Sequence, residues 1–217
     1  MIALAAFDIA GTTVDEQNAV YRVLAAVVAD HGTPARDTDI RRWMGADKRE
    51  ALAALTGDPA AVEDLHAQFV TRLHHAYATT RPTPLPGIPE TLAALRSAGV
   101  RVALTTGFDR QVTDPLLEAL GWRIGDHLDA VVCASEVPAG RPEPHMIHRA
   151  MELTGVTDPT TVLVAGDTAL DIRAGHAARA TTVIGVLTGA QTRDELAAEN
   201  PTHILDGVHQ IPALLGM

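Results

Sequence analysis

The 217-residue sequence has one cysteine, Cys133, so no disulfide framework can hold its fold. Aromatic residues make up only 3% of the chain, and its core must therefore be built from Ala, Val, Leu and Ile. No apolar run approaches the roughly 20 residues that a membrane span needs. The apolar stretch at residues 2–7 is too short for a secretion signal and is followed at once by Asp8. We therefore expect a soluble cytoplasmic protein with no membrane partner.

Positive charge is also scarce. The 17 Lys and Arg residues stand against 27 Asp and Glu residues, which gives a formal net charge of −10. Binding to nucleic acid requires a basic surface, so this balance argues against nucleic acid as a partner. A small anionic substrate stays compatible with the charge, because a metal ion and a few local cations can override the overall field.

Beyond residue 82 the sequence alternates between short apolar runs and amphipathic segments. The apolar runs predict strands, and the segments between them predict helices. This alternation indicates a parallel sheet with helices on both faces, an α/β doubly wound, Rossmann-like fold. The strands are expected at 2–7, 100–104, 130–133, 161–165 and 182–186, and the helices at 89–98, 109–120, 142–154 and 168–179.

Residues 15–80 differ from the rest because they show helical periodicity and no convincing strand. Four apolar stripes predict four helices there. The three prolines within residues 82–86 then form a stiff connector. The sequence therefore predicts two domains, a core of residues 1–14 and 82–217 and an all-helical insert of residues 15–81.

Polar residues follow four of the predicted strands, at the edge of the sheet where open α/β folds bind ligands. Asp8 follows the first, Thr106 the second, Arg141 the third, and Asp167 with Asp171 the fourth. Two carboxylates four residues apart at a strand–helix junction can reach the same point, and Mg²⁺ prefers such hard oxygen ligands. Taken singly, each position has a simpler interpretation as a turn, a helix N-cap, an exposed loop arginine or an acidic helix start.

In this order the segments Asp8-Ile9-Ala10-Gly11-Thr12-Thr13, Thr105-Thr106-Gly107, Gly140-Arg141 and Gly166-Asp167-Thr168-Ala169-Leu170-Asp171 resemble the four motifs of the haloacid-dehalogenase superfamily. The helical insert also falls where that superfamily has its cap domain. The resemblance implies that Asp8 attacks phosphorus and forms an aspartyl-phosphate. Thr106 would bind a phosphoryl oxygen, and Arg141 would offset negative charge. A Mg²⁺ ion would be held by Asp8, the Ala10 carbonyl, Asp167 and Asp171.

Ala10 departs from the superfamily's phosphatases, which usually have a second Asp here to protonate the leaving alcohol. An alanine methyl group cannot transfer a proton. This substitution is known in the phosphonoacetaldehyde hydrolase family, which cleaves a carbon–phosphorus bond after a cap lysine forms a Schiff base with the substrate aldehyde. The segment Met44-Gly45-Ala46-Asp47-Lys48 resembles that family's cap, as do residues 105–108 and 137–142. The resemblance implies that Lys48 carries the amine, and that Ala10, Gly11, Thr12, Met44, Gly45, Gly107 and Phe108 contact the substrate.

The surroundings of Lys48 suit a reactive amine. Asp47 and Glu50 have capping-box spacing, which predicts Lys48 in the first turn of a helix. The positive helix end and desolvation under a closed cap both lower the pKa of a lysine toward that of a nucleophile. An exposed lysine is the simpler alternative on spacing alone. Ala51, where the family has a proton-shuttling His, and Phe108, where it has Tyr, favour a sister group with a different substrate.

The leading hypothesis is a Mg²⁺-dependent hydrolase of the phosphonatase type, with a small phosphonate such as phosphonoacetaldehyde as substrate. The first alternative is a phosphatase for a small phosphate monoester, in which water or a cap residue replaces the missing acid. A sugar-phosphate mutase needs that acid twice, and a haloacid dehalogenase needs no Mg²⁺. A non-catalytic, phospho-ligand-binding regulator would not need all four motifs. The family also implies a homodimer through cap helices, for which Tyr21, Ala25 and Val28 are candidate contacts.

Overall fold

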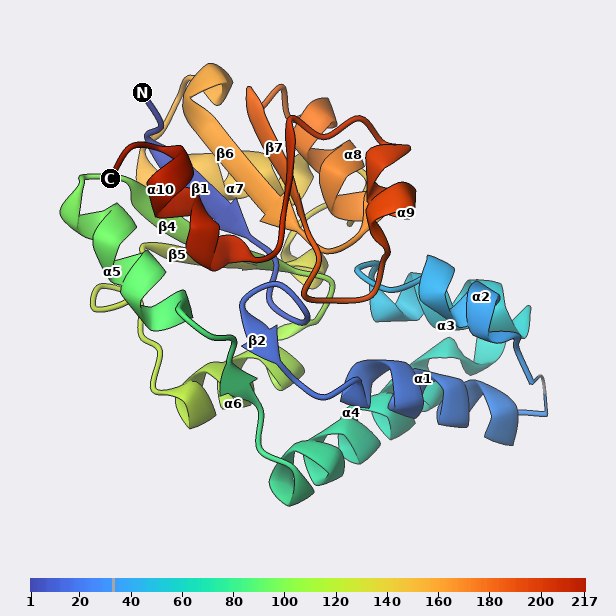
Figure 1. Cartoon of the computed structure of the whole chain (residues 1–217). Helices are drawn as coiled ribbons and strands as arrows, with labels where there is room; N and C mark the ends of the chain where they lie inside the picture. Colours follow the sequence, from blue (N-terminus) through green and yellow to red (C-terminus); the bar gives the residue numbers. More distant parts are fainter. Residues whose placement is uncertain (33) are drawn as a thin grey trace.

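A six-stranded sheet forms the centre of the computed structural model, which describes residues 1–32 and 34–217. The strand order is β5-β4-β1-β6-β7-β8, and every pair of neighbours is parallel. Parallel neighbours require long crossover connections, and helices supply most of them (Figure 1). The strands are β1 Leu4–Phe7, β4 Arg101–Thr106, β5 Ala130–Cys133, β6 Val162–Gly166, β7 Thr182–Val186 and β8 His203–Leu205.

Helices cover both faces of the sheet, because successive strand side chains point to opposite faces. On one face Ala5 and Phe7 share a buried cluster with α5 and α6. On the other face Leu4 and Ala103 share a cluster with α7 and α8. The helices are α5 Ile88–Ser97, α6 Arg110–Leu120, α7 His145–Thr154, α8 Ala169–Ala177, α9 Arg193–Ala197 and α10 Ile211–Leu214. The expected α/β doubly wound fold is therefore confirmed.

Four helices lie between two short strands, β2 Val14–Asp15 and β3 Thr83–Pro84, which pair antiparallel. We call residues 16–82 the cap segment. Its long helices α1 and α4 pack along each other, and α3 packs against α4. Aliphatic stripes bury these contacts, as the helical periodicity predicts. The helices are α1 Ala19–Asp30, α2 Asp37–Arg42, α3 Lys48–Thr56 and α4 Val62–Thr79.

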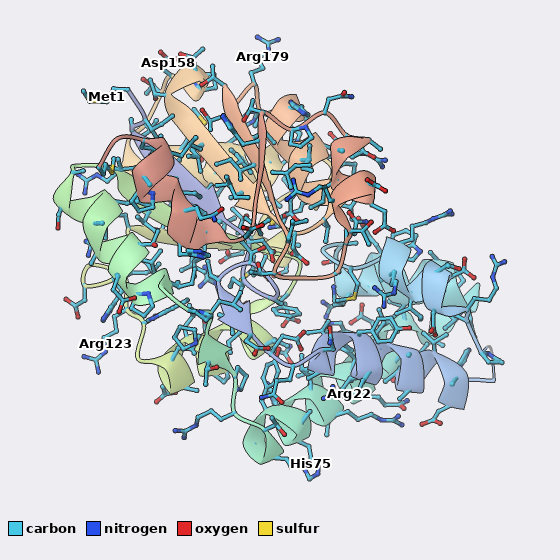
Figure 2. The ribbon with its side chains drawn as sticks, in the orientation of Figure 1. Met1, Arg22, His75, Arg123, Asp158 and Arg179 are labelled. Atoms are coloured by element: carbon cyan, nitrogen blue, oxygen red, sulfur yellow. The ribbon has the colours of Figure 1, made fainter. Side chains whose placement is uncertain are left out.

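The cap segment lies beyond the carboxyl ends of the strands. In Figure 2, Met1, Asp158 and Arg179 mark the opposite end of the molecule, whereas Arg22 and His75 lie on the cap segment. Asp158 stands shortly before β6 in the chain, so the strands begin at the far end and run toward the cap segment. Residues that follow the strands therefore face it.

The sequence pattern does not predict the three C-terminal elements α9, β8 and α10. The strand β8 is a three-residue edge strand with only partly buried or exposed side chains, so it has no apolar run to identify it. Val28, a candidate contact for a homodimer, is fully buried within the chain's own core. Val28 is therefore wrong as a contact residue, because a buried side chain cannot reach a second copy, and the homodimer itself stays a prediction. Over the described residues, no helix combines the length and the apolar character needed to cross a membrane.

Candidate active site

The cap segment and the core together enclose a small cavity at the carboxyl ends of the strands. The core lines it with Asp8, Ala10, Thr106, Gly107, Phe108, Asp167 and Thr168, and the cap segment with Val20, Met44, Gly45 and Lys48. The cavity has a volume of about 20 Å³, close to the minimum that holds one water molecule. The structure therefore brings most of the expected site residues together, in an arrangement closed against solvent.

Asp8 lies directly after β1, and it forms an ion pair with a buried arginine. The Arg141 Nη1 atom is 2.8 Å from Asp8 Oδ1, and Arg141 Nε is 2.8 Å from Asp171 Oδ1. Arg141 also donates from Nη2 to the carbonyl and the hydroxyl of Thr105. Arg141 is only 4% exposed, so it is a buried bridge between two carboxylates, and the alternative of an exposed loop arginine is wrong.

Asp171 has both carboxylate oxygens engaged. Besides the contact with Arg141, its Oδ2 atom accepts hydrogen bonds from the backbone N–H and the hydroxyl of Thr168, at 3.1 and 2.5 Å. Thr168 in turn caps α8 through the Asp171 N–H. The position of Asp171 therefore fixes the arginine, and its expected role as a direct metal ligand stays a prediction.

Asp167 lies directly after β6 and is held by two distant segments. Its Oδ1 atom accepts from the Thr12 hydroxyl at 3.1 Å, and its Oδ2 atom accepts from the Ala190 N–H at 2.6 Å. The loop that contains Ala190 also binds the nucleophile loop, because the Thr188 hydroxyl donates to the Gly11 carbonyl at 2.6 Å. Gly11 and Thr12 do not line the cavity itself but bond to residues that hold it, and their expected contact with substrate stays a prediction.

Two buried carboxylates here lack a full counter-charge. Burial raises the pKa of Asp8 to about 7, an effect that Arg141 opposes and Asp171 strengthens. Burial and the charges of Asp8 and Asp171 raise the pKa of Asp167 to about 8. Buried carboxylates whose pKa is raised by burial and by neighbouring like charges are the setting in which a cation stabilises the ionised forms.

The carboxylate and carbonyl oxygens around Asp8 are of the type that binds Mg²⁺. No group of three Asp, Glu, His or Cys side chains gathers closely enough to hold a metal in the part of the chain that the structure describes. A Mg²⁺ ion would therefore rely on the carboxylates of Asp8 and Asp167, with the Ala10 carbonyl and water as further ligands. Hard oxygen ligands and retained waters are what this ion prefers.

Lys48 contributes the amine of the site. It is the only lysine in the sequence, and it is 3% exposed. It begins α3, where the Asp47 carboxylate accepts from the N–H groups of Arg49 and Glu50, so the predicted first-turn position is confirmed. Burial lowers its pKa to about 8, and the charges of Asp47 and Asp8 oppose that shift. The alternative of an exposed lysine is therefore wrong.

The lysine amine is held between backbone and an aromatic ring. Its Nζ atom donates to the Ala46 carbonyl at 2.7 Å and lies 5.6 Å from the centre of the Phe108 ring. A ring face attracts the protonated amine, and it offers no proton of its own. Ala51 is fully buried in the cap segment, so its methyl group packs where the related family has a histidine. Thr106 lines the cavity beside this pair, and its expected contact with a phosphoryl oxygen stays a prediction.

The two loops that meet above the nucleophile approach each other at backbone distance. A Cβ atom on Gly107 would overlap the carbonyl groups of Ala46 and Gly45. Gly45 has a φ of +82°, and a Cβ there would lie 2.8 Å from the Thr168 hydroxyl. Only glycine allows this close approach, and the positive φ of Gly45 also favours glycine. The glycines therefore permit the closed cavity.

Comparisons with known proteins agree with this fold. Residues 2–179 match the model of the haloacid dehalogenase-like hydrolase family. A phosphonoacetaldehyde hydrolase of Hahella chejuensis is 33% identical, over 84% of this chain and 67% of that protein. An N-acetylmuramic acid 6-phosphate phosphatase of Pseudomonas aeruginosa is 30% identical, over 91% and 85%. The crystal structure of a phosphonoacetaldehyde hydrolase-like protein from Oleispira antarctica superimposes with a TM-score of 0.84 at 19% identity, over 99% and 91%.

The fold and these matches define the class of the protein as a hydrolase with a Rossmann-like core. The chain belongs to the haloacid dehalogenase-like hydrolase family. Its relatives bear the names of both a phosphonate hydrolase and a phosphate-ester phosphatase, so the choice of reaction has to be argued from the site.

Proposed function

We propose that the protein is a Mg²⁺-dependent hydrolase of the phosphonatase type, which cleaves the carbon–phosphorus bond of a small oxo-phosphonate such as phosphonoacetaldehyde. The observation that carries the proposal is Lys48, the only lysine, buried in the same small cavity as Asp8 with its pKa lowered to about 8. Ala10 supports it, because no carboxylic acid at that position can protonate an alcohol leaving group. The relatives named phosphonoacetaldehyde hydrolase support it as well.

The division of labour between two domains is part of the proposal. A core of residues 1–14 and 82–217 would carry Asp8, Arg141 and the metal ligands. A cap domain of residues 15–81 would carry the amine and would open to admit substrate, because the closed cavity of about 20 Å³ has no room for it.

The reaction would begin at Lys48. A pKa of about 8 leaves an appreciable fraction of the amine unprotonated at neutral pH. The lysine Nζ atom adds to the substrate aldehyde carbon, and loss of water gives an iminium ion. The iminium draws electrons from the neighbouring carbon–phosphorus bond. Cleavage of a phosphonate needs such an electron sink, because its leaving group is a carbon, whereas cleavage of a phosphate ester does not.

Asp8 would then act as the nucleophile. A carboxylate oxygen attacks phosphorus, the carbon–phosphorus bond breaks, and its electron pair forms an enamine on Lys48. Arg141, 2.8 Å from Asp8 Oδ1, offsets negative charge during this step. Thr106 and the loop that follows it would contact phosphoryl oxygens. Mg²⁺ on Asp8, Asp167 and the Ala10 carbonyl would supply further positive charge, so that the anionic groups can approach.

Water would complete the turnover at both covalent centres. Hydrolysis of the aspartyl-phosphate returns Asp8 and releases phosphate. Protonation of the enamine carbon and hydrolysis of the resulting iminium return Lys48 and release acetaldehyde. The sum is phosphonoacetaldehyde plus water giving acetaldehyde plus phosphate, and no oxidant or reductant is needed.

A phosphatase for a small phosphate monoester is the second candidate. The observation that favours it is the N-acetylmuramic acid 6-phosphate phosphatase relative, which is 30% identical over most of both chains. In that reading Asp8, Arg141 and the metal keep their roles. Lys48 would contact the phosphate as a cation, and its lowered pKa would have no chemical use.

Borohydride trapping separates the two candidates. Added during turnover of phosphonoacetaldehyde, borohydride should reduce the iminium to a stable secondary amine on the peptide that contains Lys48, as mass spectrometry would show. The sequence has no second lysine, so the N-terminal amine of Met1 is the internal control. Lys48→Arg should neither trap nor turn over, because guanidinium stays protonated, and it should still bind Mg²⁺. If oxo-phosphonates give no adduct and no phosphate while a phosphate ester is hydrolysed, the phosphatase is the better assignment.

A further inference from the structure

Asp109, in the core, contacts two residues of the cap segment beside the amine. Its Oδ2 atom lies 3.5 Å from Arg49 Nη1 and 3.4 Å from His66 Nε2. Arg49 belongs to α3 and His66 to α4, whereas Asp109 precedes α6. Asp109 is 8% exposed and His66 is 4% exposed. Among the described residues, Asp109 is the carboxylate that forms an ion pair between core and cap segment, with Arg49. Burial and the charge of Arg49 lower the pKa of His66, which favours a neutral ring beside it.

The two sides of this contact adjoin the candidate active site in sequence. Lys48 immediately precedes Arg49, and Phe108 immediately precedes Asp109. Lys48 and Phe108 face each other across the cavity, 5.6 Å from Nζ to ring centre. The Asp109 contacts therefore hold the first turn of α3 against the first turn of α6, at the place where the amine lies.

The two carboxylate oxygens of Asp109 make different contacts. Oδ1 accepts from the Val112 N–H at 3.3 Å and caps α6. Oδ2 makes both contacts with the cap segment. An asparagine side chain keeps one carbonyl oxygen, which can still accept the hydrogen bond at the N-terminus of α6. Asparagine is as good a helix N-cap residue as aspartate. The substitution Asp109→Asn therefore separates the cross-domain contact from helix capping.

We propose that Asp109, with Arg49 and His66, is a latch that holds the cap segment closed and positions Lys48 over the nucleophile. The cavity is too small in the closed arrangement to admit a phosphonate, so the enzyme must open and reclose in each turnover. The other hydrogen bonds across the seam use backbone carbonyls, as from Arg41 to Ala190 and from Arg141 to Gly45. The latch adds an ion pair between charged side chains to these hydrogen bonds. It is a positioning device, and it does not touch the reacting atoms.

The solitary lysine provides a direct assay of latch opening. A small amine-acetylating reagent can reach buried Lys48 only when the cap segment opens, so the labelling rate reports the open population. Mass spectrometry of the Lys48 peptide follows the rate, and the exposed N-terminal amine of Met1 is the internal standard. Rates taken across the amine's titration distinguish a change in access from a change in pKa. The assay needs no substrate, so its outcome is independent of the proposed reaction.

Asp109→Asn should raise the labelling rate of Lys48 about fivefold, as expected for loss of a partly buried ion pair of ordinary strength. The melting temperature should stay close to that of the wild type, because α6 keeps its cap. Asp58→Asn is the matched control. Asp58 also caps a helix, with a histidine, His31, 3.3 Å away, but that pair lies wholly within the cap segment. It should leave the labelling rate unchanged.

A second variant guards against an effect of Asp109→Asn on folding. Arg49→Gln should raise the rate to a similar extent, and the double variant should show less than the product of the two single effects, because both changes break the same contact. An unchanged rate in Asp109→Asn, an equal rise in Asp58→Asn, or fully multiplicative single effects would overturn the latch.

Discussion

Replacing Lys48 by methionine should abolish the proposed phosphonate cleavage and at the same time stabilise the protein. Burial lowers the pKa of Lys48 from 10.5 to about 8, so the folded state disfavours the ammonium form. That difference corresponds to roughly 3 kcal/mol, and at 3% exposure little solvent screening reduces it. The lost hydrogen bond to the Ala46 carbonyl costs about 1 kcal/mol. Methionine fills a similar volume flexibly, so the free energy of unfolding should rise by about 2 kcal/mol.

The gain in the free energy of unfolding should become smaller as the pH rises. The folded pKa of Lys48 is below the unfolded value, so the penalty is fully present below about pH 8, where the amine is protonated in both states. It fades as the pH rises and is absent above 10.5, where the unfolded amine is also neutral. Urea unfolding of both proteins at the two ends of this window measures the difference. Because the chain has no other lysine, no second lysine titrates in that window.

Arg149→Met is the control, because the Arg149 side chain is 48% exposed and its ion pair among the described residues is with Glu152 of the same helix. It should change the unfolding free energy by less than about 0.5 kcal/mol at either pH. The reasoning is refuted if Lys48→Met is less stable than the wild type below pH 8, or if the difference between the two proteins is the same at both ends of the window.

Two further predictions concern the nucleophile loop. The pKa values of Asp8 and Asp167, raised from 3.8 to about 7 and 8, mean that stability is lost as the pH rises from 3.8 through these values, above which the folded carboxylates are ionised. Mg²⁺ should therefore raise the melting temperature more above pH 8 than below pH 7, and Asp8→Asn should remove most of that increase; an equal shift at both pH values would count against a metal on these carboxylates. Ala10→Asp should accelerate hydrolysis of simple alkyl phosphates by ~10²-fold or more, since it supplies a general acid. Ordinary enzyme rates of the wild type on such esters would contradict this.

The core was predictable because most of its strands are short, continuous apolar runs in the sequence. Each residue of β1 is fully buried, which makes its apolar run continuous, and polar residues follow where the strand ends. Lys48 was predictable from a local pattern as well, since its capping residue Asp47 is its neighbour. The edge strand β8 has no such run, because one of its faces meets solvent.

The supports of the site could not be predicted in the same way. Ala190 contacts Asp167 through its backbone N–H, a group that nearly every residue has, so its identity carries no signal. Asp109 is recognisable as a helix cap, but its second oxygen meets residues 60 and 43 positions earlier in the chain, counting from Arg49 and His66. Contacts of that separation depend on how the cap segment folds back, which local spacing does not encode.

The loop around Ala190 sets a limit on how the site can be transplanted. The matched family model ends at residue 179, yet Thr188 and Ala190 hold the Gly11 carbonyl and Asp167 in place. Ala190 also accepts a hydrogen bond from Arg41 of the cap segment. A chimera that joined the first 179 residues to a relative's C-terminal part would keep all four motifs and exchange the loop that aligns them. The functional unit of this chain is therefore longer than its motifs, and any graft of the site has to include β7 and the loop after it.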